Sequence, residues 1–155
     1  MKFMYWVDRI LSAICVTLMT VLVVCVVWQV FSRYVLGAPS TSTDELARFL
    51  FIWVSLLGAA FTLGQKKHLA MDFMLLVLEG KKRATLNIVI TLIGLVFAVV
   101  IMLIGGSGLV LKTLSHGQVS PVLGWQMGWV YSAIPLSGAC MVVYLLRDLL
   151  VSNSK

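Results

Sequence analysis

The sequence predicts an all-α membrane protein in which four transmembrane helices form one domain over residues 1–155. Composition is the first observation: 61% of the 155 residues are hydrophobic, only 12% are charged, and the mean hydropathy is +1.03. Because soluble domains carry about 25% charged residues, these values argue against a cytosolic enzyme, a disordered chain and a disulfide-rich secreted module. The apolar residues also form long charge-free runs, and the charges gather between them.

The first two spans are expected over residues 10–33 and 46–65. The run Ile10–Ser32 carries no charge, and at about 1.5 Å per residue it is long enough to cross a hydrocarbon core of about 30 Å. It is too long for a cleaved signal peptide, so we expect a retained helix. A turn at Pro39 separates the two spans.

The start of the second helix carries its own signals. Ser42 and Glu45 have the spacing of a capping box, in which the two residues satisfy backbone N–H groups of the first turn reciprocally. Asp44 and Glu45 then fall in that turn, where the helix macrodipole favours negative charge. We therefore expect this helix to begin near Thr43, outside the hydrocarbon.

The third and fourth spans are expected over residues 84–111 and 124–146. Near the end of the third, the glycine-rich stretch Gly105–Gly108 permits a close approach of backbones and weakens the helix. In the fourth, Pro135 removes one helical hydrogen bond and predicts a kink. The spacing of Gly124 and Gly128 is a weak signal for helix packing.

Between the second and third spans we expect a short amphipathic helix over residues 69–80. His68, Asp72 and Glu79 fall on one side at helical spacing, and most other residues are apolar. This pattern favours a helix that lies flat at the cytoplasmic interface. Its apolar face could rest on lipid or on a partner protein, and the sequence leaves both possibilities open.

The distribution of basic residues predicts the orientation. With the N-terminus in the cytoplasm, only Arg33, Arg48 and Lys112 of the 12 Lys and Arg residues lie on the opposite side. Positive charge marks cytoplasmic loops, so both termini are expected to be cytoplasmic, and the net charge of +6 indicates topology rather than nucleic-acid binding. Four tryptophans are expected in the outer aromatic belt: Trp28, Trp53, Trp125 and Trp129.

The sequence shows no candidate active site. Every carboxylate lies near a span end or in a loop, whereas ion-coupled transporters carry ionisable groups within their spans. Cys15, Cys25 and Cys140 lie in apolar runs without a CxxC pair, and His68 and His116 fall on opposite sides of the membrane. We expect no metal, cofactor or catalytic residue, so the chain is most simply a subunit that acts by packing.

One charged cluster lies at the outer end of the first two spans. Asp44 and Arg48 are spaced as an i,i+4 pair, and Glu45 and Arg48 as an i,i+3 pair. Arg33 ends the first span, within reach of these carboxylates. The cluster either fixes the two helices to each other or provides a docking point for a soluble partner. Trp125 and Trp129 are further interface candidates.

Several segments, taken in order, resemble one family over nearly the whole chain. They are Trp28–Tyr34, Asp44–Arg48, Gly58–Ala60, Lys67–Asp72, Ser120–Pro121 and Trp129–Pro135. Together they resemble the small membrane subunit (DctQ-like) of tripartite ATP-independent periplasmic (TRAP) transporters.

The resemblance implies a place in the bacterial inner membrane beside a large permease subunit that moves its substrate as an elevator. A periplasmic binding protein would deliver an organic anion, such as a C4-dicarboxylate or a sialic acid, and a sodium gradient would drive uptake. The small subunit would brace the permease and help to receive the binding protein. Membrane lipids complete the expected partners, and we expect the separate rather than the fused form of the subunit.

Carried over by position, the resemblance makes Glu45 and Arg48 an acidic–basic pair at the second helix. Arg33 matches the basic end of the first helix, and His68 and Asp72 match the loop motif. We expect all five to be structural or interface residues. On this hypothesis, replacing Glu45 or Arg48 with alanine weakens assembly or docking without altering substrate choice.

Two other classes remain as alternatives. One is a membrane-anchor subunit of an oxidoreductase, in which His68 or His116 completes a haem site shared with a partner. A haem absorbance band in the purified complex would distinguish it. The other is a self-assembling small channel, which would have to show flux without any partner.

Overall fold

The structure is a computed structural model that describes residues 2–65 and 81–152. Its helices are long and apolar enough to cross a membrane in four places, which confirms the predicted all-α membrane fold. The spans are Met4–Tyr34, Thr41–Gly64, Thr85–Ser115 and Met127–Leu150.

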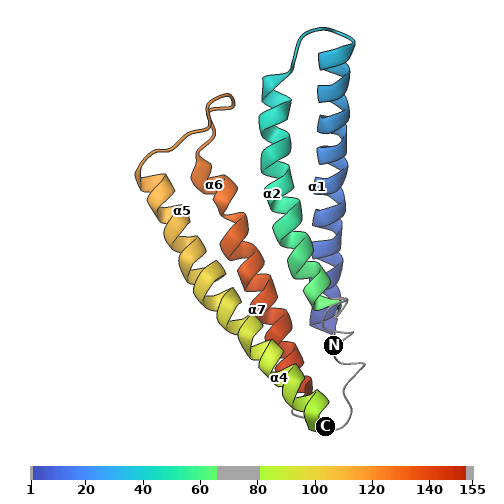
Figure 1. The fold of residues 1–155 in the computed structure, drawn as a ribbon, viewed down its shortest axis with the longest axis vertical. Helices are drawn as coiled ribbons and strands as arrows, with labels where there is room; N and C mark the ends of the chain where they lie inside the picture. Colours follow the sequence, from blue (N-terminus) through green and yellow to red (C-terminus); the bar gives the residue numbers. More distant parts are fainter. Residues whose placement is uncertain (1, 66–80, 153–155) are drawn as a thin grey trace.

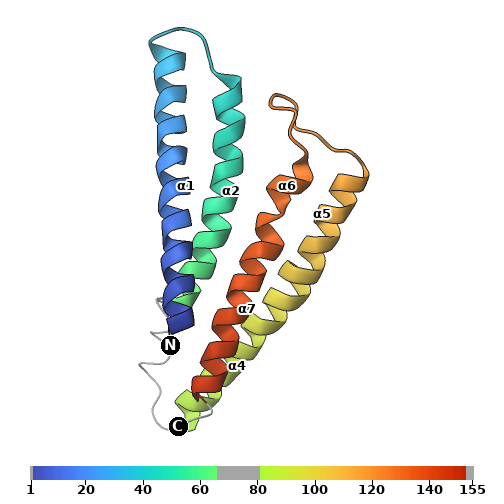
Figure 2. The same ribbon diagram turned by 180° about the vertical axis from the view of Figure 1, so that it is seen from behind.

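The first two spans form a helical hairpin, shown in blue and green in Figures 1 and 2. It consists of α1 (Lys2–Tyr34) and α2 (Thr41–Gly64), which lie side by side along their length. The turn between them passes through Gly37, whose φ of +65° suits a residue without a side chain. Residues 35–40 are therefore enough to reverse the chain.

The second hairpin joins the third and fourth spans (Figure 1). Its first arm runs without interruption through α4 (Lys81–Val96), η1 (Phe97–Gly105) and α5 (Gly106–Ser115). Its second arm consists of α6 (Met127–Tyr131) and α7 (Ala133–Ser152), which pack against the first arm. The third and fourth candidate spans, Thr85–Ser115 and Met127–Leu150, lie in these two arms.

The middle of the third span, η1, has the hydrogen-bond pattern of a π-helix, which the uniformly apolar sequence did not indicate. Ala98 and Met102 on this segment are buried against α7, where Gly138 provides the necessary space. A Cβ atom on Gly138 would stand 2.7 Å from the Cβ of Met102 and 3.3 Å from the carbonyl oxygen of Ala98. The widened helix and the missing side chain therefore bring the two backbones close together.

Close approach also occurs at the predicted glycine-rich stretch. A Cβ atom on Gly106 would stand 2.8 Å from Ile134 and 3.1 Å from Pro135, so no larger residue fits there without a shift. The predicted role of this stretch in backbone packing is confirmed at Gly106.

The helix of the fourth span is interrupted close to Pro135, where the sequence predicts the loss of one helical hydrogen bond. Helix α6 ends at Tyr131 and α7 begins at Ala133. Pro135 has no N–H group with which to continue the ladder at this point, and the next amide, that of Leu136, donates to the carbonyl oxygen of Ser132 at 3.2 Å. The interruption therefore separates a short first helix from a long second one.

The start of the fourth span differs from the prediction. Gly124 has φ of +67° and lies in the loop before Met127, the first residue of α6. The expected pairing of Gly124 with Gly128 on one helix is therefore wrong. Gly128 alone packs closely, since a Cβ atom there would stand 2.4 Å from the Cγ atom of Leu114.

The molecule has two ends that differ in structure. We call the end with residues 35–40 and 116–126 the loop end, and the end where α1 begins and α7 finishes the terminal end (Figures 1 and 2). The start of α1 at Lys2 and the end of α7 at Ser152 lie at the same end, as an even number of spans requires. Their cytoplasmic location stays a prediction, and the expected helix at 69–80 lies outside the described residues.

Most of the helix surface is not buried by the chain itself. Only a minority of the residues along each span are buried, and large apolar side chains point outward on every helix from α1 to α7. Trp53 lies near the middle of α2, half-buried against the cluster of Leu11, Leu57 and Tyr144, a position that disagrees with its expected place in the outer aromatic belt. The exposed apolar faces are available to lipid or to another protein.

Candidate interface at the loop end

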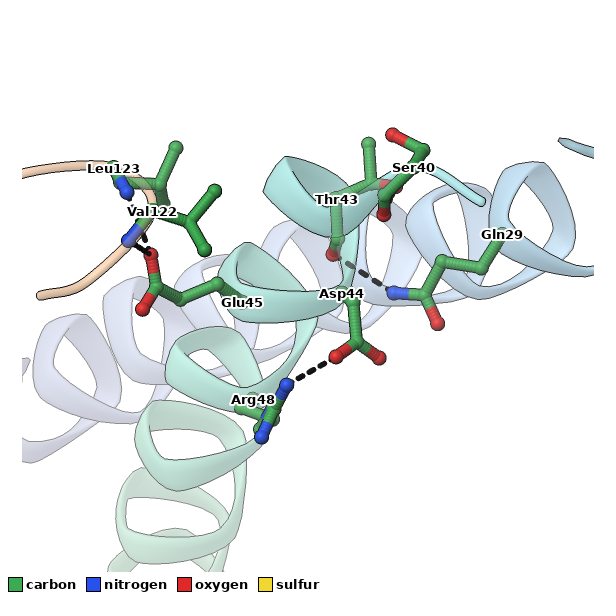
Figure 3. A network of polar contacts seen from close by, with 8 residues as sticks. All are labelled: Gln29, Ser40, Thr43, Asp44, Glu45, Arg48, Val122 and Leu123. Carbon is green, nitrogen blue, oxygen red and sulfur yellow. Dashed lines mark hydrogen bonds and ion pairs between the residues drawn. The ribbon is translucent and has the colours of Figure 1, made fainter. Parts of the chain in front are cut away.

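Glu45 forms the central contact of the loop end (Figure 3). Although it lies in the second turn of α2, its residue is only 6% exposed. One carboxylate oxygen, Oε2, accepts hydrogen bonds from the backbone N–H groups of Val122 at 3.2 Å and Leu123 at 2.7 Å. Hydrogen bonds to an ionised carboxylate are stronger than neutral ones, so this side chain joins α2 firmly to the loop of the second hairpin.

The predicted capping box is therefore wrong. The carboxylate of Glu45 is occupied by the distant loop, and Ser40, which has an extended backbone, is the N-cap residue. The helix begins at Thr41, and the hydroxyl of Thr43 donates to the carbonyl oxygen of Ser40 at 3.1 Å. Local spacing suggested a local partner for Glu45, but the tertiary fold supplies a better one.

A sequence signal for the buried position of Glu45 does exist. Apart from Ala47, the buried residues of α2 are spaced by three, four or eight positions, which places them on one side of the helix: Glu45, Phe49, Leu57, Ala60 and Gly64. Glu45 therefore belongs to the buried stripe of an amphipathic helix. A carboxylate within such a stripe requires a buried hydrogen-bond partner, although the pattern does not identify it.

The loop that binds Glu45 is itself tightly organised. Val119 and Gln126 form an isolated antiparallel bridge, and the buried Ser120 pairs with Trp125 inside it. The Ser120 amide donates to the Trp125 carbonyl at 2.8 Å, and the Ser120 hydroxyl accepts from the Trp125 amide at 3.2 Å. Val119, Val122 and Trp125 remain exposed. The loop thus presents apolar side chains on a fixed backbone.

The other charged residues of the predicted cluster are placed differently. Arg48 pairs with Asp44, as the i,i+4 spacing predicts, and both side chains are exposed, at 72% for Arg48 and 45% for Asp44. The expected ion pair between Arg48 and Glu45 is wrong. The Glu45 carboxylate faces the loop, on another side of the helix from Arg48 (Figure 3). An exposed ion pair of this kind contributes roughly 0–1 kcal/mol to stability.

Arg33 does not bridge the first hairpin as expected. Within residues 2–65 and 81–152 it forms no ion pair with Asp44 or Glu45, although Arg33 and Asp44 line the same surface hollow of about 250 Å³. The link across the hairpin comes instead from Gln29, whose Nε2 donates to the carbonyl oxygen of Thr43 at 2.8 Å (Figure 3). Sequence reasoning missed Gln29, since a glutamine near a span end has no distinctive spacing.

The remaining candidates fall into two groups. Trp125 and Trp129 are exposed at the loop end, at 54% and 69%, and border an apolar hollow between the two hairpins. His68 and Asp72 lie outside the described residues. In the described part of the chain, no group of three or more His, Cys, Asp or Glu residues could hold a metal ion.

A polar cluster that the sequence analysis missed lies at the terminal end. The hydroxyl of Tyr144 on α7 donates to Asp8 Oδ1 on α1 at 2.5 Å. The neighbouring Arg147 donates through Nη2 to the carbonyl oxygen of Gly64, the last residue of α2, at 2.9 Å. The Arg147 guanidinium also stands 5.6 Å from the centre of the Tyr144 ring, within the range of a cation–π contact. One helix thus holds the ends of two others.

Comparison with known proteins identifies the class. The profile of the DctQ component of tripartite ATP-independent periplasmic transporters matches residues 22–152. The chain belongs to this family, which is a component of a transporter and not an enzyme. The chain is accordingly a multi-pass protein of the inner membrane.

Individual relatives agree with the family. The chain is 28% identical to the sialic acid TRAP transporter small permease protein SiaQ of Vibrio cholerae over 141 residues, which cover 88% of the chain and 77% of the relative. It is 23% identical to a putative TRAP transporter small permease protein of Haemophilus influenzae over 146 residues, covering 94% and 89%.

A longer relative indicates the partner. The chain is 26% identical to the sialic acid TRAP transporter permease protein SiaT of Haemophilus influenzae over 116 residues, which cover 74% of this chain but only 18% of SiaT. In that protein, a region similar to this chain belongs to a much longer permease. Small TRAP subunits pair with large permease subunits.

Proposed function

We propose that this chain is the small scaffold subunit of a sodium-driven TRAP transporter that imports an organic acid anion of the C4-dicarboxylate or sialic acid type. In this role it braces a large elevator subunit and helps to dock a periplasmic binding protein. The sodium drive, the elevator and the anion are carried over from the family, and the roles of bracing and docking draw support from this chain's own surfaces.

The observation that carries the bracing role is the unburied apolar surface of the spans. Large apolar side chains are exposed along α1, the third span and α7, while Asp8, Asp44, Glu45 and Asp148 all lie toward helix ends. Such a chain has much surface to offer a membrane partner and little with which to coordinate an ion in the bilayer. The coupling and substrate sites then belong to the large subunit.

The docking role rests on the loop end, which we propose faces the periplasm. Its organised loop exposes Val119, Val122 and Trp125, and the exposed Arg33 and Arg48 lie on the neighbouring hairpin. Aromatic side chains on a fixed backbone are well suited to recognition, because little conformational entropy is lost on binding. Glu45 acts in docking through the loop, since it is itself buried.

Co-purification and uptake assays test both roles. The large subunit should co-purify with the tagged chain, and uptake into proteoliposomes should require both membrane subunits, a binding protein and a sodium gradient. Trp125→Ala should lower uptake most when the binding protein is scarce, whereas Trp6→Ala, which removes an exposed tryptophan at the terminal end, should not. Equal uptake by wild type and Trp125→Ala at limiting binding protein would contradict the docking role.

A further inference from the structure

The two hairpins do not meet evenly along their length. In both views they lie close at the terminal end and diverge toward the loop end (Figures 1 and 2). The inner helices of the hairpins, α2 and α7, pack against each other. A pair of rigid arms joined in this way can change its separation at one end while the other end stays fixed.

One buried apolar cluster at the terminal end joins three of the four spans. Leu11 of α1, Leu57 of α2 and Tyr144 of α7 form one buried cluster. Tyr144 packs so closely on Gly64 that a Cβ atom there would stand 2.5 Å from its ring. With the Tyr144 and Arg147 hydrogen bonds added, side-chain packing and polar contacts both restrain this end.

At the loop end, a hollow lies between the two hairpins where the terminal end has this cluster. An apolar hollow of about 320 Å³ lies between the hairpins, lined by Leu18 and Phe49 on one side and Trp129 and Val130 on the other. The buried cluster nearest this end, composed of Leu22, Cys25 and Ala47, joins α1 only to α2. Apolar packing therefore does not tie the two hairpins together here as it does at the terminal end.

The Glu45 carboxylate spans this division. It belongs to α2, one turn before Phe49, and both of its hydrogen-bond donors belong to the loop of the second hairpin. The amides of Val122 and Leu123 both donate to Oε2 of this carboxylate across the division (Figure 3). Losing them would leave the loop attached to its own hairpin but not to α2.

We propose that Glu45 is a lock that sets the separation of the two hairpins at the loop end, with the Tyr144 cluster as a fixed pivot at the terminal end. When the loop amides leave the carboxylate, the hairpins open about the pivot and the apolar hollow widens. Any protein that binds the loop and displaces Val122 and Leu123 would thereby alter the arrangement of the spans. The lock is a property of this chain and does not depend on the proposed transport function.

Distance measurements between paired spin labels test the lock in the full chain, reconstituted in lipid nanodiscs. One pair, at Tyr34 on α1 and Leu111 on α5, reports on the loop end, and a second pair, at Tyr5 on α1 and Leu150 on α7, reports on the terminal end. All four positions are exposed. Labels attached to non-natural amino acids leave the native cysteines unchanged.

Glu45→Leu is the main variant, because leucine preserves helix propensity and apolar packing but accepts no hydrogen bond. It should lengthen or broaden the Tyr34–Leu111 distances and leave the Tyr5–Leu150 distances unchanged. Glu45→Gln, which keeps one neutral acceptor, should give a smaller change in the same direction. The matched control is Asp44→Leu, which removes the adjacent exposed carboxylate and should alter neither pair.

Loop-end distances in Glu45→Leu that superimpose on those of the wild type would overturn the lock. Equal broadening at both ends would overturn the pivot, since it would indicate general loosening of the bundle. An equal effect in Asp44→Leu would assign the change to charge at the start of α2 instead of to the loop contact.

Discussion

The terminal end and the loop end of this bundle achieve cohesion in different ways. At the terminal end, Tyr144 combines a fully buried ring with a hydrogen bond to Asp8, so packing and polarity act on the same side chain. At the loop end, Glu45 supplies a strong polar contact beside an apolar hollow between the two hairpins. Packing resists displacement over many atoms, whereas a carboxylate contact can break in one step. We therefore expect the terminal end to be rigid and the separation of the hairpins at the loop end to be variable.

The largest expected effect is at the terminal end. Gly64→Leu places a side chain where a Cβ atom alone would stand 2.5 Å from the Tyr144 ring. The ring must move and lose its contacts, so we expect a loss of about 3 kcal/mol, near the upper end of the range for overpacking. Thermal unfolding of the purified full chain in detergent measures it.

Gly58→Leu on the same helix is the matched control, because a Cβ atom at Gly58 meets no atom of the described residues within 4 Å. It should unfold at or slightly above the wild-type temperature, since leucine is a better helix former than glycine. Equal unfolding temperatures for Gly64→Leu and Gly58→Leu would contradict the claim that the close packing of Tyr144 on Gly64 makes the terminal end rigid.

The second effect concerns the loop end. Glu45→Leu leaves the amides of Val122 and Leu123 without their acceptor, at a cost of about 2 kcal/mol, because each unpaired donor loses its hydrogen bond but can regain water. Hydrogen exchange should accelerate at these two amides and change little at Tyr144. Exchange that is equally fast in the wild type would show that the contact does not hold the loop.

A smaller effect separates packing from polarity at the terminal end. Tyr144→Phe keeps the buried ring and removes only the hydroxyl that donates to Asp8, so the loss should be about 1.5 kcal/mol, the lower end of the range for a hydrogen bond to a charged group. Tyr5→Phe, on an exposed tyrosine of the same end, should leave the unfolding temperature unchanged. A loss as large as that of Gly64→Leu would mean that the polar contact and not the ring holds this end.

The smallest effect is expected at the exposed pair of Asp44 and Arg48. Asp44→Asn and Arg48→Gln should each lower stability by less than about 0.5 kcal/mol, because solvent screens the pair. A double-mutant cycle on unfolding temperature measures their coupling. Strong coupling would make the loop end depend on two carboxylates and would weaken the contrast between Glu45 and its neighbour.

The all-α membrane fold with four long apolar helices was predicted correctly because it depends on hydropathy, which is local. The predictions at Pro135 and at Gly106 were confirmed for a similar reason, since a missing N–H group and a missing side chain act wherever the helix is placed. The pairing of Asp44 with Arg48 was also predicted, because both residues lie on one helix at fixed spacing.

The candidate site was predicted less well. Glu45 was identified as a site residue, but its assignment to a capping box and to a pair with Arg48 was wrong, because its partners lie 77 and 78 residues further along the chain. Gln29, Tyr144 and Arg147 were missed for the same reason: each contacts a group on another helix. Hydrogen-bond donors and acceptors are common along any chain, and sequence spacing does not indicate which of them meet.

By itself, the sequence determined that this is a membrane protein with four transmembrane helices and that it resembles the small subunits of TRAP transporters. Each of these properties depends on the local order of apolar, charged and turn-forming residues. Only the tertiary structure decided that the two hairpins are clamped through Tyr144 at one end and joined through Glu45 at the other. The physical reason is that lipid tails are as apolar as the side chains, so moving an apolar side chain from lipid to a neighbouring helix changes the free energy little. The arrangement of the helices therefore depends on a few close-packed glycines and on polar contacts between distant residues.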